Sequence, residues 1–294
     1  MTHGRPGSRA APLHRRYASL VKLEHTIFAL PFAYAGAILA GRGEGVFPSW
    51  SDLLWITVAM AAARSLAMAI NRLVDREIDA RNPRTAGREL PRGALAPAQV
   101  AAFCLFALAL YLLAVFQLAP VVRYLCPIPV IAFLVYPYLK RVTWLCHLWL
   151  GATIGLAPLA AWLALGKPFA WAPCALWLAV ASWIAGFDML YALYDLEVDQ
   201  AQRLHSVAAR FGVVGAFRGA RILHVATVTA LVLAGVLGGA GSVWYAGAVA
   251  VAALLLYEHL IVSPSDLRRL DAAFFTANSF VAVVFLAFVI GDAL

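Results

Sequence analysis

The chain is built from long runs of hydrophobic residues separated by short polar segments. Each run is close to the roughly 20 residues that a helix needs to cross the hydrocarbon core of a bilayer. The runs are continuous rather than alternating, which favours helices over the strands of a membrane barrel. They occupy residues 24–42, 51–76, 98–119, 122–139, 145–166, 170–196, 214–238, 242–262 and 269–291. The pattern predicts an all-α, polytopic membrane protein with nine transmembrane helices in one bundle.

The polar segments define the expected domain organisation. Residues 1–22 are polar and rich in arginine, and we interpret them as a basic cytoplasmic tail. Residues 23–294 then form a single transmembrane domain. Most connections within it are short, but two are long, at about 77–97 and 197–213.

Composition agrees with a membrane protein. Of 294 residues, 63% are hydrophobic and 13% are charged, whereas about 25% of residues are charged in a typical soluble domain. This composition excludes an ordinary water-soluble enzyme and a disordered chain. The formal net charge of +8 could indicate nucleic-acid binding, but most basic residues lie in a few short segments between the apolar runs. That distribution marks the cytoplasmic side of a membrane protein, so no nucleic-acid partner is expected.

The distribution of lysine and arginine predicts the orientation. With a cytoplasmic N-terminus, sixteen basic residues lie on the cytoplasmic side and three on the other. The three are Arg42, Arg123 and Lys167. With nine spans the C-terminus then lies outside, and the expected location is the inner (cytoplasmic) membrane.

Acidic residues concentrate at the cytoplasmic ends of two apolar runs. Seven of the fifteen lie in two short windows, whose main acidic residues, Asp75 and Asp195, are 120 positions apart. Helical spacing places the members of each window in one stripe. The first stripe is Asn71, Asp75 and Asp79, and the second is Asp188, Tyr191, Asp195 and Asp199. Glu77 and Glu197 point away from the stripes and are interpreted as ordinary interface charges.

These stripes need positive charge close by. Carboxylates one helical turn apart repel one another, and a charge at membrane depth costs about 2.5–3.5 kcal/mol on insertion scales. Neighbouring arginines and lysines could compensate, or a divalent metal could. Ligand sets made only of oxygen suit Mg²⁺, which shares its coordination shell with substrate phosphates. Two facing stripes therefore indicate a metal-bridged diphosphate, while simple pairing with neighbouring arginines is the structural alternative.

The two motifs, NxxxDxxxD and DxxYxxxDxxxD, resemble those of the UbiA superfamily of intramembrane prenyltransferases. The resemblance covers nearly the whole chain and includes YPYLKR at 136–141 and GFDMLYALYDLEVDQAQRLHSVAARFG at 186–212. Within the superfamily the sequence is most similar to the 4-hydroxybenzoate polyprenyltransferase branch. LEHTIFALPFA at 23–33 and LHSVAARFG resemble a bacterial subgroup tied to menaquinone made by the futalosine route. Arg203 departs from the glycine often found before LHS.

The resemblance implies a fold and an activity. The fold is a helical bundle around a central cavity that opens at the cytoplasmic side. The activity is transfer of a polyprenyl chain from its diphosphate to a ring carbon of an aromatic acid, in ubiquinone or menaquinone synthesis. It also implies two Mg²⁺ ions held by Asp75, Asp79, Asp195 and Asp199, with Asn71 as a neutral ligand or hydrogen-bond donor. Asp188 would hold metal or contact the reacting centre, and Tyr191 would line the site of the allylic cation.

Basic residues near the motifs are candidates for substrate binding. Lys140 and Arg141 end the fourth apolar run on the cytoplasmic side, and Arg84 lies in the phrase NPRT. We expect these three to contact the diphosphate, although anchoring of the helix end also explains the first two. Arg64 lies inside the second run, seven residues before Asn71, and intramembrane arginines face polar interiors. It would bind the diphosphate or the acceptor carboxylate, with a structural ion pair to Asp188 as the alternative.

Other functions remain open at this point. A secondary transporter also carries intramembrane carboxylates, but near the midplane on broken helices rather than at helix ends. A CDP-alcohol phosphotransferase carries one compact acidic motif, not two. Within the preferred enzyme class, a naphthoate-type acceptor is the alternative to 4-hydroxybenzoate. The sequence assigns neither a prenyl chain length nor an oligomeric state.

Overall fold

The computed structural model describes residues 12–21, 29–267, 270 and 278–294. Within these residues the chain is helical, and its only β pairing is an isolated bridge between Ser263 and Asp266. The helices are α1 (Leu13–Val21), α2 (Leu30–Gly41), α3 (Trp50–Val74), α4 (Arg76–Arg81), α5 (Pro97–Phe116), α6 (Pro120–Leu125), α7 (Pro127–Leu139), α8 (Cys146–Ala164), α9 (Trp171–Tyr191), α10 (Leu196–Ala201), α11 (Val207–Leu237), α12 (Ser242–Ile261) and α13 (Asn278–Ala293). Two short 3₁₀ helices, η2 (Arg42–Glu44) and η3 (Ala192–Asp195), follow α2 and α9.

Seven helical segments in the described residues are long and apolar enough to cross a membrane, so the protein is a multi-pass membrane protein. They are 50–74, 97–116, 120–139, 146–164, 171–201, 207–237 and 242–261. α13 is apolar but shorter, and α2 has 12 residues. The predicted spans 24–42 and 269–291 begin at residues that the structure does not describe. The predicted domain boundary at 22–23 also lies outside the described residues. The count of nine spans therefore stays a prediction.

Two expected boundaries differ from the structure. The run at 122–139 is divided into α6 and α7, with Pro127 opening the second helix, where its missing N–H is tolerated. The predicted run at 214–238 matches the part of α11 that follows a break at Gly212, whereas α11 itself begins earlier, at Val207, where the Ser206 side chain accepts the Ala209 N–H and caps the helix. Gly212 takes φ 69° and ψ −178°, a conformation that only glycine adopts without strain.

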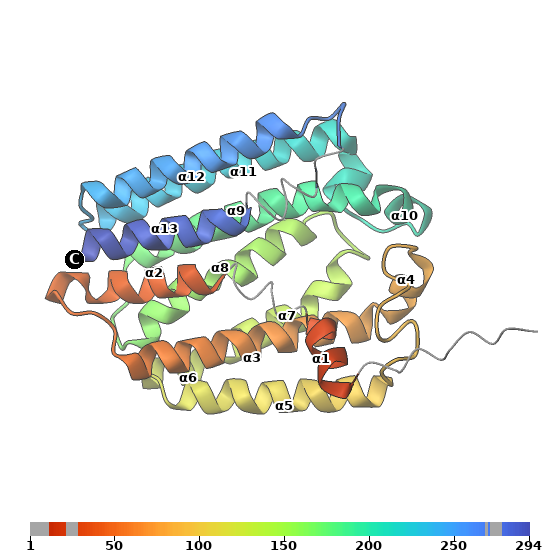
Figure 1. Ribbon diagram of the computed structural model, residues 1–294, viewed down its shortest axis with the longest axis horizontal. Helices are drawn as coiled ribbons and strands as arrows, with labels where there is room; N and C mark the ends of the chain where they lie inside the picture. Colours follow the sequence, from red (N-terminus) through yellow and green to blue (C-terminus); the bar gives the residue numbers. More distant parts are fainter. Residues whose placement is uncertain (1–11, 22–28, 268–269, 271–277) are drawn as a thin grey trace, which may run out of the picture.

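The helices run roughly along the long axis of the molecule in two groups (Figure 1). α9 packs against α8 on one side and α11 on the other, while α3 packs against α5 and α7. α2 contacts both α8 and α13. Between α2 and α8 the approach is very close, since a Cβ added at Gly36 would lie 2.2 Å from the carbonyl oxygen of Pro158. Small residues that allow backbones to approach are typical of helix packing in membranes.

The largest buried cluster lies between α2, α9, α11, α12 and α13. Phe285 is central to it, with its ring centroid 5.6 Å from that of Phe32 and 5.0 Å from that of Trp244. On the outside of the bundle, by contrast, large apolar side chains such as Leu105, Ile222 and Leu260 are exposed. A surface of this kind suits contact with lipid tails.

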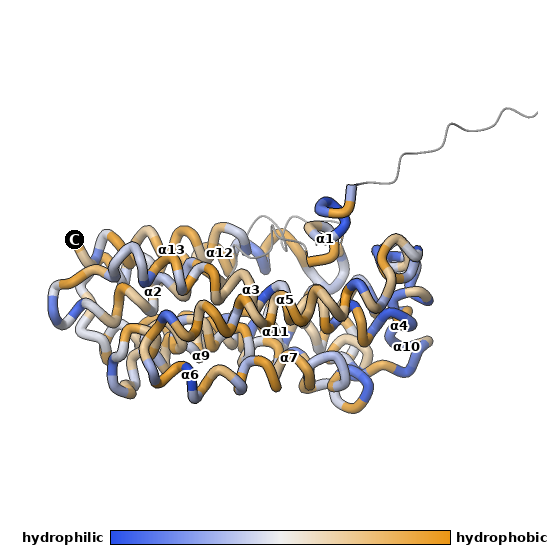
Figure 2. The backbone as a smooth tube through the Cα atoms, turned by 90° about the horizontal axis from the view of Figure 1, so that it is seen from below, coloured by the Kyte–Doolittle hydropathy of each residue, from blue (hydrophilic) through white to orange (hydrophobic). Residues whose placement is uncertain are grey.

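Hydrophilic residues gather at one end of the bundle, where α4 and α10 lie, and the C-terminus lies at the other end (Figure 2). α1 is attached near the hydrophilic end. The guanidinium of Arg16 donates to the carbonyl oxygen of Ala94 over 2.9 Å, and the Tyr17 ring stacks on Phe103 at 5.1 Å. The fold thus places both acidic motifs at a single polar end.

Candidate active site

A cavity of about 680 Å³ lies between α3, α5, α6, α7, α8 and α9. Its polar end is formed by the ends of α3 and α9 and by the segments that follow them. Its other end is apolar and is lined by residues such as Leu118, Leu163 and Phe169. The cavity therefore offers one charged end and a long hydrophobic interior.

The first acidic motif spans a break between two helices. α3 ends at Val74, and Asp75 takes φ −93° and ψ 10° before α4 begins. The helical spacing is kept, because the Asp75 N–H donates to Asn71 O over 2.9 Å and the Asp79 N–H donates to Asp75 O over 2.8 Å. The Asn71 side-chain amide also donates to Asp75 Oδ2, at 3.2 Å.

The second motif repeats this break. α9 ends at Tyr191, η3 follows, and Asp195 takes φ −107° and ψ 7° at the start of α10. Asp75 and Asp195 thus occupy equivalent junctions in nearly the same backbone conformation, a sparsely populated region in which active-site residues often lie. The two junctions are 120 residues apart in the chain.

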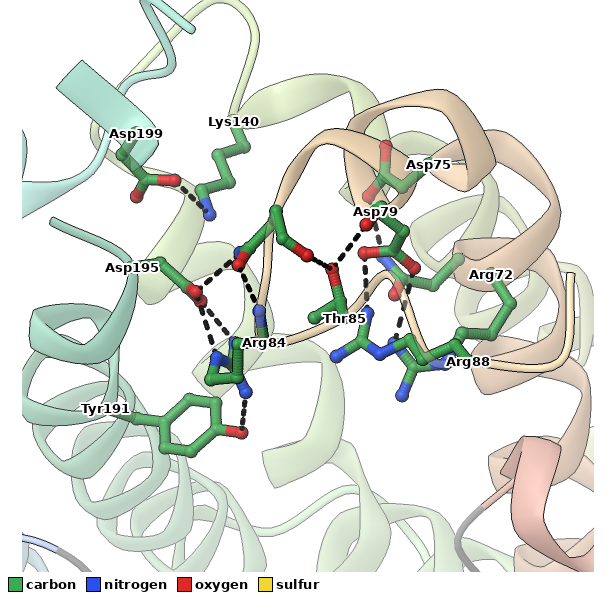
Figure 3. A network of polar contacts seen from close by, with 12 residues as sticks. Arg72, Asp75, Asp79, Arg84, Thr85, Arg88, Lys140, Tyr191, Asp195 and Asp199 are labelled. Carbon is green, nitrogen blue, oxygen red and sulfur yellow. Dashed lines mark hydrogen bonds and ion pairs between the residues drawn. The ribbon is translucent and has the colours of Figure 1, made fainter. Parts of the chain in front are cut away.

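Each of the four motif aspartates at the cavity mouth has a basic partner, and Figure 3 shows those of Asp79, Asp195 and Asp199. Arg141 donates to Asp75 Oδ1 over 2.9 Å and Arg88 to Asp79 Oδ1 over 2.6 Å. Lys140 Nζ lies 2.8 Å from Asp199 Oδ1, and Arg84 pairs with Asp195. The alternative of pairing with neighbouring cations is thus realised in the structure.

The segment between α4 and α5 joins the two motifs. Asn82 donates from its amide to Asp195 Oδ1 over 2.7 Å, and Arg84 Nε donates to the same oxygen over 3.0 Å. A second guanidinium nitrogen of Arg84 donates to the Tyr191 hydroxyl over 2.8 Å. These contacts connect positions more than 100 residues apart, so the ends of α3 and α9 face one another across the cavity mouth.

Lys140 and Arg84, which are paired with motif aspartates at the mouth, keep their positive charge. Burial disfavours the ammonium form of Lys140, but Asp199 outweighs it and the pKa of Lys140 lies above its ordinary value. Burial likewise opposes the charge of Arg84, yet its bonds to Asp195 raise its pKa above the ordinary value. Both groups stay cationic at neutral pH. For Asp75, burial raises the pKa against the opposing effect of Arg141.

Two of these carboxylates also have an oxygen that is available to bind a metal. Asp79 Oδ2 and Asp199 Oδ2 are buried and have no hydrogen-bond partner among the described residues. Asp79 Oδ2 has only a long ion pair, 3.9 Å from the Arg72 guanidinium; buried oxygens without a hydrogen bond are rare in proteins, and an oxygen-only donor set suits Mg²⁺. No three acidic, histidine or cysteine side chains within the described part of the chain converge to form a complete metal site. The residues fit Mg²⁺ if phosphate oxygens complete its shell.

Deeper in the cavity lie two charged residues, Arg64 and Asp188. Arg64 Nε is buried and has no hydrogen-bond partner in the described part of the structure. Asp188 is bonded instead to His147, with 2.7 Å between Asp188 Oδ2 and His147 Nδ1. The expected alternative of an ion pair between Arg64 and Asp188 is not found among the ion pairs of the described residues.

The sequence-derived candidates lie mostly in this one cavity. Its lining includes Asn71, Asp75, Asp79, Asp188, Tyr191, Asp195, Asp199, Arg64, Arg84 and Lys140. Arg141 is not part of the cavity lining, and it donates a hydrogen bond to Asp75. Sequence reasoning missed Asn82, Thr85 and His147, all of which line the cavity. Asn82 lies in the NPRT phrase, which was a signal that could have identified it, whereas His147 has no distinctive spacing.

Comparisons with known proteins identify relatives over nearly the full length. The sequence pattern described as the UbiA prenyltransferase family matches residues 29–286. A 4-hydroxybenzoate octaprenyltransferase from Marinobacter nauticus is 30% identical over 274 residues, covering 92% of each chain. One from Tolumonas auensis is 29% identical over 285 residues, covering 96% of this chain and 94% of that protein.

Solved structures share the fold. A UbiA homologue from Aeropyrum pernix K1, solved in its apo form, superposes with a TM-score of 0.82 at 28% identity, covering 92% of this chain and 99% of that one. A UbiA homologue from Archaeoglobus fulgidus, solved with GPP and Mg²⁺ bound, gives a TM-score of 0.67 at 19% identity over 95% of this chain and 99% of that one. At that identity the second likeness shows the fold alone.

Proposed function

Because the chain belongs to the UbiA prenyltransferase family, we propose that it transfers a polyprenyl chain from its diphosphate to a ring carbon of 4-hydroxybenzoate in an Mg²⁺-dependent reaction. The family makes the chain a prenyltransferase rather than a secondary transporter or a CDP-alcohol phosphotransferase. The full-length relatives named 4-hydroxybenzoate octaprenyltransferase support the choice of acceptor. We place the reaction in ubiquinone or menaquinone synthesis.

One observation carries the proposal. Two acidic motifs from distant parts of the chain meet at the polar end of a cavity whose interior is otherwise hydrophobic. A polyprenyl diphosphate has the matching shape and polarity, with a charged diphosphate group at one end and a long apolar chain. A ligand that is polar throughout would leave the apolar interior unfilled.

At the polar end, Asp75, Asp79, Asp195 and Asp199 would hold two Mg²⁺ ions, with Asn71 as a neutral ligand. Bound there, the metal would supply Lewis-acid stabilisation to the departing diphosphate. Arg84 and Lys140 bind the phosphate oxygens directly, as their retained positive charge supports. Arg141 holds Asp75 from outside the cavity lining, over 2.9 Å.

In the interior, the acceptor lies close to Arg64. Its buried Nε has no partner among the described residues, and a carboxylate is the ligand that an arginine fork binds best. The Tyr191 ring lies beside the charged end, since its hydroxyl is bonded to Arg84 and Arg84 Cζ lies 5.2 Å from the ring centroid. An aromatic face there would stabilise an allylic cation, and the apolar walls exclude water from it. Asp188 contacts the reacting ring.

The membrane arrangement follows from the same polar end. We propose nine transmembrane helices, with residues 1–22 as a cytoplasmic tail and 23–294 as one domain in the inner membrane. The segment that carries α4 holds five arginines between residues 76 and 97, and the segment that carries α10 holds Arg203 and Arg210, which favours a cytoplasmic position for both. The cavity then opens at the cytoplasmic side, and the C-terminus lies outside.

A product analysis tests the proposal. Purified protein in detergent or nanodiscs would be given Mg²⁺, a series of prenyl diphosphates, and either 4-hydroxybenzoate or 1,4-dihydroxy-2-naphthoate. The expected result is a prenylated 4-hydroxybenzoate together with one diphosphate released per product, and neither forms when the metal is chelated. Prenylation of the naphthoate alone would replace the proposed acceptor, and no product with any donor would overturn the proposal.

A further inference from the structure

His147 and Asp188 form a pair at the wall of the cavity, below the ion pairs of the mouth. His147 lies in the first turn of α8 and Asp188 in the last turn of α9. His147 Nδ1 is 2.7 Å from Asp188 Oδ2. The side chain of His147 is 4% exposed and that of Asp188 is 18% exposed, so the imidazole is covered while the carboxylate faces the cavity.

The other ring nitrogen of His147 fixes its protonation. The backbone N–H of Val207, the first residue of α11, donates to His147 Nε2 over 3.2 Å. A backbone N–H can only donate, so Nε2 must be the unprotonated nitrogen of the imidazole. Nδ1 therefore carries a proton and donates a hydrogen bond to Asp188 Oδ2, so the carboxyl group of Asp188 is the acceptor.

This arrangement reverses the roles of the familiar aspartate–histidine pair, in which the carboxylate orients the imidazole. Here Nε2 accepts the hydrogen bond from the Val207 N–H and the ring is buried. His147 therefore has no ring nitrogen available to accept a proton from a substrate. Asp188 keeps its second carboxylate oxygen, Oδ1, free of the histidine and faces the space where a substrate lies. The histidine holds the carboxylate at one angle.

The histidine is itself held on both sides. Its neighbour Cys146 lies with Sγ 3.5 Å from the carbonyl oxygen of His205, and the His205 N–H donates to the carbonyl oxygen of Lys140 over 2.7 Å. Together with Val207, these contacts tie the start of α8 to the segment between α10 and α11. That segment follows α10, which carries Asp199, so the start of α8 is tied to the chain just after the second acidic motif.

Resting on the prenyl transfer proposed above, we propose that His147 is a positioning residue that holds ionised Asp188 as the acceptor of the proton lost from the aromatic ring. The ring carbon forms its new bond to C1 of the prenyl group as the C1–O bond breaks and the diphosphate leaves with that electron pair. The proton on the same ring carbon then passes to the Asp188 carboxylate. The C–H electron pair returns to the ring and restores its aromaticity.

Three variants separate positioning from other roles. His147→Phe keeps a ring of similar size but removes both hydrogen bonds. His147→Gln keeps one donor and one acceptor on a neutral side chain, and so can satisfy Asp188 and Val207 together. His259→Phe is the matched control, because His259 is also a membrane-helix histidine, is bonded to His224, and does not line the cavity.

We expect kcat for prenylation of 4-hydroxybenzoate to fall about 10²-fold in His147→Phe, the lower part of the range for positioned proton transfer. The KM for prenyl diphosphate stays within about twofold, since the residues that bind it are untouched. His147→Gln retains activity within about tenfold of the wild type, and His259→Phe matches the wild type. Thermal unfolding in detergent confirms that each variant is folded.

An isotope effect provides a readout that a purely structural defect would not change. With 4-hydroxybenzoate deuterated at the ring positions beside the hydroxyl, the primary isotope effect on kcat is expected to be larger in His147→Phe than in the wild type. A displaced Asp188 slows proton removal relative to C–C bond formation. In His147→Gln the isotope effect returns to the wild-type value.

Several outcomes overturn the inference. One is a folded His147→Phe variant with wild-type kcat, and another is a lowered kcat with an unchanged isotope effect. A folded His147→Gln variant with kcat lowered about 10²-fold or more relative to the wild type would show that the imidazole acts by proton transfer, and this test does not depend on the folding of the Phe variant. Wild-type protein that forms no product would overturn the proposed function instead, so the two failures are distinguishable.

Discussion

Arg84 and Asp195, 111 positions apart in the chain, make the contact on which the polar end of the cavity most depends. A carboxylate removed from water is destabilising unless a cation and hydrogen-bond donors surround it. Asp195 has both, from Arg84 and Asn82, and each of the other motif aspartates at the mouth has its own cation. Charge here is balanced residue by residue, so a single substitution changes the field that the diphosphate meets.

The motif aspartates give the first prediction. Asp75→Asn and Asp195→Asn should each abolish product formation, because an amide is a much weaker ligand for Mg²⁺ than a carboxylate. The variants should still insert and fold, as shown by size-exclusion chromatography and thermal unfolding in detergent.

Each motif supplies its own control. Glu77→Gln and Glu197→Gln change exposed carboxylates that lie next to the motif positions, and both variants should keep wild-type turnover. Near-normal activity in either aspartate variant would contradict the assignment of these residues to metal.

Arg64 gives the second prediction. Arg64→Ala should raise the KM for 4-hydroxybenzoate about tenfold or more, the equivalent of about 1.4 kcal/mol, while the KM for prenyl diphosphate changes much less. Steady-state kinetics with each substrate varied in turn measure the difference. Arg218→Ala, at an exposed position on α11, should leave both constants unchanged, and equal effects of Arg64→Ala on the two substrates would assign Arg64 to the diphosphate.

For individual residues, the sequence predicts the site where side chains recur at helical spacing. It does not predict hydrogen bonds between residues that are far apart in the chain. The stripes of Asp75, Asp79, Asp195 and Asp199 follow from helical periodicity, and their meeting in one cavity was expected. The bond from Asn82 to Asp195 depends on how the segment after α4 folds back, and no local pattern predicts it. His147 lies in an apolar run without metal-ligand spacing, so only the neighbouring helices reveal its partner.

At the scale of elements, the breaks after α3 and α9 are the features that shape the site. Both motifs run across the end of a long helix into a six-residue helix. The junction turns the chain so that the segment from residue 82 to 88 can cover the cavity mouth and bring Arg84 to Asp195. A continuous helix would carry the second aspartate of each motif away from the opposing helix.

The covering segment gives the third prediction. Arg84→Ala removes the cation that joins it to Asp195, and an uncompensated carboxylate then repels the diphosphate. The KM for prenyl diphosphate should rise about tenfold, which corresponds to about 1.4 kcal/mol. Arg81→Ala, at an exposed position outside the cavity lining, is the control, and an equal effect in both variants would reduce the role of Arg84 to general surface charge.

The contact between α2 and α8 gives the fourth prediction. Gly36→Ala places a methyl group against the backbone of Pro158, which cannot move aside as a side chain can. It should destabilise the fold by about 1–3 kcal/mol, the usual range for overpacking, and lower the unfolding temperature. Gly43→Ala meets no atom within 4 Å and should be neutral, so equal unfolding temperatures for the two variants would contradict the close packing.

Hydrophobic runs locate helices well but locate their internal breaks poorly. The run at 242–262 matches α12 closely, because nothing interrupts it. The division between α6 and α7 and the break inside α11 both arise at single residues, Pro127 and Gly212, whose effect depends on the surrounding helices. Mean hydropathy does not register a change of backbone direction at one position.

At the scale of the whole molecule, the orientation in the membrane is the main expectation that the packing leaves for experiment. The polar end that carries α4 and α10 is separated by the length of the bundle from the C-terminus (Figure 2). Orientation is set by loop charge during insertion rather than by contacts in the folded state, which is why the sequence bears on it more directly than the fold does.

The fifth prediction follows from that charge distribution. Alkaline phosphatase fused to the C-terminus should be active, because it folds only outside the cytoplasm, and green fluorescent protein fused there should be dark. A reporter pair inserted at Gly43, between α2 and α3, should behave in the same way, and one inserted at Gly87, between α4 and α5, should give the opposite result. A fluorescent C-terminal fusion would overturn the orientation.

The balanced ion pairs at the cavity mouth also affect which ligands can bind there. Its basic groups are already neutralised by internal carboxylates, so a simple anion such as chloride gains little by entering and must separate existing partners to do so. A polyphosphate that arrives with its own divalent counterions can exchange partners on both sides at once, giving anions to the arginines and cations to the aspartates. We therefore expect the site to bind a diphosphate together with divalent cations more strongly than it binds a simple anion alone.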